Sequence, residues 1–219
     1  MDFKSNCDEN VIKFLEEVSE QHPEIQKWSL WLTIDLNDNC VDLKKIVEIT
    51  AEKLKLLSLK VYEEVTDSML EEFVNAAGGQ LTHLILKGNH ISGEEFSVES
   101  EKLKKLQSLV FFYCASLTDA GLSKLINSTG GELVELNLEG TEITNINVEK
   151  DKLEQLQYLS LYSCGSLTND GLSKLINSTG GKLVWLNLDC TNITNINVDK
   201  YKLEQLQSLI LNGFDSQGQ

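Results

Sequence analysis

The sequence predicts an α/β repeat fold in which short strands alternate with helical or irregular segments. Residues 117–165 and 167–215 are nearly the same sequence displaced by fifty positions, with 15 differences in 49 aligned residues. Each copy contains the spacing Leu-x-x-Leu-x-Leu twice. The Leu-x-Leu alternation places apolar side chains on one face of a short strand. A repeat of this length predicts one continuous array of small units.

The leucine spacing marks eight successive modules, each with one predicted strand. Five modules are unambiguous and two earlier ones follow the same rule, whereas the first is weaker because Ser29 stands where its first leucine would be. The residues at the strand centres are Leu32, Leu57, Leu84, Leu109, Leu136, Leu159, Leu186 and Leu209. Consecutive centres are 23 to 27 residues apart. The alternation of steps predicts two kinds of module.

The longer modules are predicted to contain a helix. A threonine caps the segment 118–126, its apolar residues follow the i, i+3, i+4 spacing, and Gly130-Gly131 is expected to stop the helix in a left-handed conformation. Residues 66–74 repeat this pattern. Shorter modules such as residues 141–148 place apolar residues irregularly among polar β-formers. We expect an extended or 3₁₀ segment there.

The charge of the chain limits the classes of partner. It contains 34 acidic residues and 19 basic residues, all of them lysine, so the formal net charge is −15. A chain of this sign repels phosphate backbones and anionic lipid, and it lacks arginine for gripping phosphate. We expect no nucleic-acid partner and no membrane insertion. A protein partner or microbial ligand that is basic or neutral fits better.

The compartment is predicted from the first residues and from the cysteines. The first ten residues contain no apolar core, which indicates no secretory signal and a cytoplasmic protein. The cysteines number five and are not closely paired, which argues against a disulfide scaffold. Three glycosylation acceptor sequences leave secretion as the minor alternative, and they begin at Asn127, Asn177 and Asn192.

One stretch carries a family motif. Residues 156–172 read Leu-x-x-Leu-x-Leu-x-x-Cys-x-x-Leu-Thr-x-x-Gly-Leu, and residues 106–122 match with Phe111 in one leucine position. This pattern resembles the cysteine-containing leucine-rich repeats of F-box-associated arrays, and the resemblance covers about residues 28–214. It implies a leucine-rich repeat solenoid, a curved horseshoe with parallel strands on its concave face. Helical and irregular segments would alternate on the convex face.

The resemblance also divides the chain and explains two cysteines. Residues 1–27 are predicted to form an N-terminal capping helix and loop, residues 28–214 a solenoid of about eight modules, and residues 215–219 a polar tail. Cys114 and Cys164 occupy the position beyond the strand whose side chain donates to a backbone carbonyl. No predicted helix closes the C-terminal end. Either the natural chain continues, or the exposed edge pairs with a second copy in a homodimer.

The expected working surface is the concave face. Of six concave positions that can be compared between the two copies, five have changed, and only the pair Asn137 and Asn187 is the same. Aromatic residues with carboxylates around them are typical of interfaces, and they also suit a sugar. The candidate ligand-binding residues are Val110, Phe112, Glu135, Asn137, Glu139, Tyr158, Tyr162, Trp185, Asn187 and Asp189.

Catalysis has little support in the sequence. The three histidines have no cysteine or serine at a recognisable spacing, and no metal-ligand spacing occurs. We therefore expect no enzyme, no catalytic or metal-binding residue and no cofactor. The expected function is non-enzymatic ligand recognition through the concave face, in innate immune recognition of pathogens. Two alternatives stay open, namely an adaptor or substrate receptor of a ubiquitin-ligase type assembly and a carbohydrate-binding protein.

Overall fold

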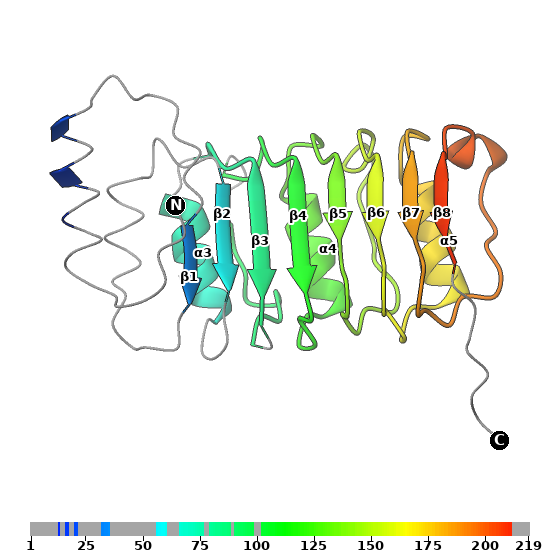
Figure 1. Cartoon of the computed structure of the whole chain (residues 1–219), viewed down its shortest axis with the longest axis horizontal. Helices are drawn as coiled ribbons and strands as arrows, with labels where there is room; N and C mark the ends of the chain where they lie inside the picture. The colour runs from blue at the N-terminus through cyan, green and yellow to red at the C-terminus, as the bar shows by residue number, and fades with distance from the viewer. Residues whose placement is uncertain are drawn as a thin grey trace.

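The computed structural model describes residues 13, 16, 17, 20, 21, 32–35, 56–60, 66–76, 79–88, 90–98 and 102–211. They form an α/β structure built on one eight-stranded sheet (Figure 1). The strands are β1 (Leu32–Asp35), β2 (Leu56–Lys60), β3 (His83–Lys87), β4 (Ser108–Phe112), β5 (Glu135–Asn137), β6 (Tyr158–Ser160), β7 (Trp185–Asn187) and β8 (Ser208–Ile210). The helices are α3 (Asp67–Ala76), α4 (Asp119–Asn127), α5 (Asn169–Asn177) and the 3₁₀ helix η1 (Lys200–Leu203).

The strands follow one another across the sheet in chain order, and every neighbouring pair is parallel. The register aligns the eight predicted strand centres in a single row that runs from Leu32 through Leu57 to Leu209. The leucine spacing therefore predicted both the number of strands and their register.

Helices α3, α4 and α5 lie behind the sheet in Figure 1 and cover one face of it. The leucines at the strand centres point to that side, where Leu109, Leu136 and Leu159 are at most 1% exposed and join one core with Leu122 and Leu125 of α4. Side chains alternate along a strand, so the residues on either side of these leucines point the other way. We call this second face, on which the described residues place no helix, the open face.

Helix α4 begins as predicted and ends differently. The Thr118 hydroxyl accepts a hydrogen bond from the third residue of the helix, as a capping threonine does. Gly131 has the expected left-handed conformation, with a φ of 81°, but it does not end the helix. The helix ends three residues earlier at Ser128, in a right-handed conformation with its N–H bonded to the Lys124 oxygen at 3.0 Å. Gly130 is needed for space instead, since a Cβ there would lie 2.1 Å from the Lys104 oxygen.

Each helix start is tied to the irregular segment that follows the next strand. The Asp119 carboxylate accepts from the backbone N–H groups of Thr144 at 2.8 Å and Asn145 at 3.0 Å. Asn169 accepts from Thr194 N–H at 3.0 Å in the same way. Residues 141–149 form neither helix nor strand, as expected for a short module. These bonds give the irregular segment a fixed path without regular secondary structure.

The two repeat cysteines are part of the scaffold, as predicted. The Cys164 thiol donates to the Leu138 oxygen at 3.0 Å, and Thr141 Oγ1 donates to the same oxygen at 2.7 Å. Cys114 stands 3.8 Å from the Leu86 oxygen. Burial raises the pKa of the Cys114 thiol from 9.0 to about 11, and it raises the pKa of Cys164 as well. Both thiols stay neutral and serve as donors.

Most of the two predicted end segments lies outside the described residues. Residues 13, 16, 17, 20 and 21 are helical, and an ion pair of 4.0 Å joins Lys13 to Glu17. The remaining residues of the predicted N-terminal cap (1–27) and the whole predicted polar tail (215–219) lie outside the described residues. Within the described part of the chain, no helix has the length and apolar character to cross a bilayer.

Candidate binding surface

The open face over β5, β6 and β7 carries three rows of side chains in register. Glu135 pairs with Tyr158, which pairs with Trp185. Two residues further along the strands, Ser160 lies between Asn137 and Asn187. Just beyond the strands, the Gly140 N–H bonds to the Tyr162 oxygen at 2.9 Å and the Ser163 N–H to the Asp189 oxygen at 3.0 Å. The backbone pairing thus continues to the third row.

We call these nine positions the grid. Its rows are Glu135-Tyr158-Trp185, Asn137-Ser160-Asn187 and Glu139-Tyr162-Asp189. Neighbouring strands are about 4.8 Å apart and residues rise about 3.3 Å along a strand, so the grid measures roughly 10 Å by 13 Å. The structure therefore brings together eight of the ten candidate residues, and Val110 and Phe112 adjoin the grid on β4.

The candidates differ in how much surface they offer. Tyr158 is 45% exposed, and the other grid side chains except Ser160 are half-buried. Val110 is only 4% exposed, because it lies between Ile85 and Asn137 in the sheet and both neighbours cover it. It therefore offers almost nothing to a partner. Phe112 keeps part of its surface at the edge of the grid.

Asn137 and Asn187, the concave pair that is identical in the two copies, have a structural task. The side-chain oxygen of Asn137 accepts from the Glu139 N–H at 3.0 Å, and that of Asn187 accepts from the Asp189 N–H at 2.9 Å. Each asparagine thereby closes the turn that begins where its strand ends. The identity of this pair is explained by the turn, and only its side-chain N–H groups remain to serve a ligand.

One register pair on the open face differs between the copies in both members. The Ser108 hydroxyl donates to Glu135 Oε2 at 2.6 Å, and Ser108 is 3% exposed. Fifty residues later, the equivalent neighbouring positions hold Tyr158 and Trp185. One copy thus has a hydrogen-bonded polar pair where the other has two neighbouring aromatic side chains. Paired changes of this kind keep neighbours compatible while the surface chemistry changes.

A second linked change lies beside the third row, and the sequence did not single it out. Gly140 has a φ of 67°, and a Cβ there would meet the Tyr113 ring at 2.4 Å. In the next copy the equivalent positions hold Cys190, with a φ of 57°, and Ser163. The smaller serine leaves room for a side chain at 190. A comparison of residues 113 and 163 between copies would have revealed Tyr113.

Tyr113 and Cys190 also shape the environment of the third row. A hydrogen bond to the Glu139 carboxylate, followed by its negative charge, raises the pKa of Tyr113. A hydrogen bond with Cys190 is the main cause that raises the pKa of Tyr162, with Tyr113 and Asp189 contributing. The row is thus a contiguous group of phenols, carboxylates and one exposed thiol.

The grid is acidic. It contains the carboxylates Glu135, Glu139 and Asp189 and no lysine, and the nearest basic side chains in its register rows are on β3. Among the residues that the structure describes, no three His, Cys, Asp or Glu side chains gather in a way that could hold a metal ion. The three carboxylates give the grid its negative charge.

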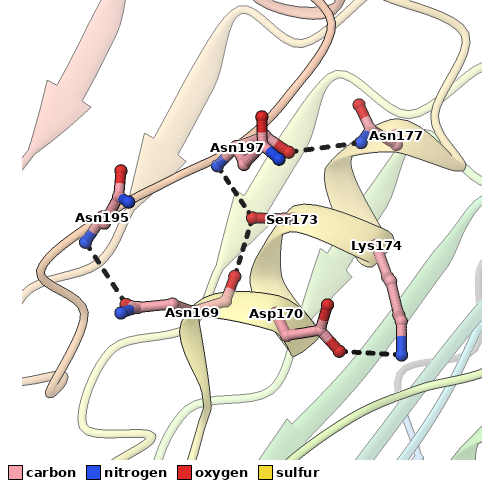
Figure 2. A pocket seen from close by; sticks show the side chains of 7 residues that line it. All are labelled: Asn169, Asp170, Ser173, Lys174, Asn177, Asn195 and Asn197. Atoms are coloured by element: carbon pink, nitrogen blue, oxygen red, sulfur yellow. Dashed lines mark hydrogen bonds and ion pairs between the residues drawn. The ribbon is translucent and has the colours of Figure 1, made fainter.

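A hollow on the helix side of the sheet is less suited to a ligand. Figure 2 shows its lining side chains bonded to one another and to the backbone of the segment beyond β7. The Ser173 hydroxyl accepts from Asn197 N–H at 2.9 Å, and Asn177 Nδ2 donates to the Asn197 oxygen at 3.4 Å. An ion pair of 2.8 Å joins Asp170 to Lys174. The ion pair lies within α5, whereas Asn169, Ser173 and Asn177 fasten the helix to the next segment.

The chain matches no protein-family model and no curated protein. Its class is therefore defined by geometry, as an α/β protein with one parallel sheet, helices on one face and an acidic, aromatic group on the other.

Proposed function

We propose that the chain is a leucine-rich repeat solenoid that binds a partner through its open face, without catalysis. The open face would be the concave face of the horseshoe. Strands in chain order, alternating helical and irregular connections, and Cys and Thr donors beyond the strands all support this assignment. The single observation that carries the binding function is the distribution of differences between the two copies.

Five of the six comparable open-face positions differ, whereas the apolar core and the bonds of the helix side are kept. Even where a helix-side residue has changed, its role has not, since Asp119 and Asn169 both accept from the next irregular segment. Random drift of exposed residues would not produce the linked change from Ser108 and Glu135 to Tyr158 and Trp185 so readily. The open face has diversified on a fixed scaffold.

The chemistry of the grid favours a protein partner with a basic or neutral segment. Aromatic anchors dominate binding free energy at interfaces, and the loss of one costs roughly 2 kcal/mol or more. Tyr158 and Trp185 would supply these anchors, while Glu135, Glu139 and Asp189 would attract positive charge. The eight strands provide a floor roughly 34 Å long, enough for an extended chain or a small domain.

The cellular role that fits best is recognition in innate defence within the cytoplasm. Diversification between copies suits a protein that meets changing ligands. The alternative role, as an adaptor of a ubiquitin-ligase type assembly, is supported only by the resemblance of residues 156–172 to F-box-associated repeats. Carbohydrate binding has one specific observation in its favour, because Tyr158 and Trp185 are neighbours beside Glu135, and stacked rings next to carboxylates suit a sugar.

The decisive experiment exchanges residues between the copies. The variant Tyr158→Ser/Trp185→Glu carries the residues that the other copy has at these two positions. The matched control Asp170→Ala carries the residue that the other copy has at the equivalent position of its helix. Each protein is tested against extended peptides graded from acidic to basic and against a panel of oligosaccharides. We expect basic peptides to bind the wild type and the control, with affinity lowered at least about tenfold in the double variant.

Two results would contradict the proposal. Equal peptide binding by the wild type and the double variant would remove the open face as the site. Binding of oligosaccharides alone, lost in the double variant, would assign the same face to carbohydrate. Circular dichroism and thermal unfolding of each variant verify that the fold is kept.

A further inference from the structure

The third row of the grid continues across β4 to the first strands of the sheet. Lys60 pairs in register with Lys87, and Lys87 pairs with Phe112. The Tyr113 N–H bonds to the Glu139 oxygen at 2.8 Å, which carries the pairing from β4 into the third row. We call the whole line the long row, and from β1 to β7 it reads Asp35, Lys60, Lys87, Phe112, Glu139, Tyr162 and Asp189.

The two signs of charge are separated on the open face from β2 to β7. Its lysines, Lys60 and Lys87, belong to β2 and β3, whereas its carboxylates belong to β5 and to the residues just beyond β5 and β7. Strand β4 lies between them and presents Ser108, Val110 and Phe112, none of which is charged. The face therefore has a positive end and a negative end with an uncharged strand between them.

Lys87 has no opposite charge beside it in the sheet. Its register neighbours are Lys60, which has the same charge, and Phe112. Like charges at directly opposite positions destabilise a sheet. Lys60 has Asp35 as its other neighbour, but Lys87 has no such compensation. Among the described residues, no ion pair joins Lys87 or Glu139 to a side chain of opposite sign. An acidic group of a partner next to Lys87 would offset the repulsion.

Aromatic side chains occupy the space between the two ends. Phe112 is half-buried in the long row, and Tyr113 beside it is 49% exposed. Tyr113 hydrogen bonds to the Glu139 carboxylate, which holds this carboxylate next to the aromatic pair. The other copy has Ser163 in place of Tyr113, so the fold does not require an aromatic residue at this turn. The uncharged middle of the face thus suits apolar side chains of a partner.

The spacing of the strands sets the distance between the charges. Neighbouring strands are about 4.8 Å apart, so Lys87 and Glu139 are roughly 10 Å apart and Asp189 lies roughly 10 Å further on. An extended chain spans about 3.3 to 3.6 Å per residue, and about three residues therefore cover each interval. The charges of a bound segment would have to follow this spacing.

We propose that the open face binds an extended segment of a partner protein in which an acidic residue is separated by about three apolar residues from basic ones. The acidic residue lies at Lys87, the apolar residues on Phe112 and Tyr113, and the basic residues at Glu139 and Asp189. This inference rests on the proposed function and adds to it the order and spacing of the partner's charges.

The test uses peptides of one composition that differ in the order of their charges. The segregated peptide has two glutamates, three apolar residues and two arginines, and it is made in both chain directions. The alternating peptide has the same residues with the charges interleaved. In a third peptide, glutamine replaces both glutamates. By isothermal titration calorimetry at low salt, we expect the better segregated peptide to bind at least about threefold more tightly than the other two. Salt should reduce this advantage, because it screens exposed charges.

A charge-neutralising variant identifies the residue that reads the acidic end. Lys87→Gln should weaken the segregated peptide about threefold and leave the glutamine peptide unchanged. The matched control is Lys150→Gln, which makes the same change of charge at an exposed lysine outside the strands. It should leave both peptides unchanged. With eight residues in place of the three-residue spacer, the effect of Lys87→Gln should disappear.

The outcomes separate this inference from the proposed function. Equal binding of the segregated and alternating peptides would overturn the inference, as would a Lys87→Gln effect that is absent or equal for peptides with and without glutamate. If the variant Tyr158→Ser/Trp185→Glu still abolished peptide binding in that case, the open face would remain the binding surface. Absence of binding by every peptide would overturn both.

Discussion

At the scale of the residue, burial decides the chemistry of the cysteines. Cys114 and Cys164 are 0% exposed and hydrogen bond to backbone oxygens, whereas Cys190 is exposed on a left-handed turn beside Asp189. A thiol in apolar surroundings resists ionisation, and the thiolate is the reactive form. Cysteines one position apart in neighbouring modules therefore have opposite expected reactivity.

We predict that iodoacetamide at pH 8 alkylates Cys190 and leaves Cys114 unmodified until the chain unfolds. The folded-state pKa of Cys114 is raised from 9.0 to about 11, so its neutral form stabilises the fold fully below pH 9, and this stabilisation is lost as pH rises towards 11. Peptide mass spectrometry measures the labelling. Equal labelling of both cysteines in the folded chain would contradict the scaffold role.

Spacing predicted the buried residues better than it predicted their neighbours on the open face. The position five after the central leucine located Cys114 and Cys164, because the thiol reaches a backbone oxygen of the preceding module after both β4 and β6. Tyr113 was not predicted, since its importance arises from contact with Gly140 in the next module. Val110 was predicted as a contact residue, yet its neighbours on β3 and β5 cover it.

At the scale of the element, the helix starts organise the segments that have no regular structure. Asp67 is 5% exposed and accepts from the N–H groups of Ser92 and Gly93, which gives the first helical module the same link as Asp119 gives the next. Helix boundaries could be predicted from capping and apolar spacing. These links could not, because each joins residues about 25 positions apart through side-chain geometry.

We predict that Asp119→Ala lowers the free energy of unfolding by about 2 kcal/mol, because it removes acceptors for two backbone N–H groups and the Thr144 hydroxyl. Asp119→Asn should cost less than about 1 kcal/mol, since Asn169 forms the equivalent link. Urea unfolding followed by circular dichroism measures both. Equal losses in the two variants would assign the effect to charge at the helix start.

At the scale of the whole molecule, stability depends on contact between successive modules. Each strand of the described sheet pairs only with the strands before and after it in the chain, so the sheet is an array in one direction. In such an array an interior module is covered on two sides and an end module on one. The two copies place identical side chains in both situations, which makes the cost of missing cover measurable.

We predict that Leu159→Ala lowers the free energy of unfolding by about 2 to 5 kcal/mol, as expected for a fully buried leucine. Leu209→Ala should cost about 1 kcal/mol in the monomer, because Leu209 is 46% exposed and less apolar surface is lost. Urea unfolding at low protein concentration gives both values. A loss for Leu209→Ala as large as that for Leu159→Ala would contradict the difference in burial between the two leucines.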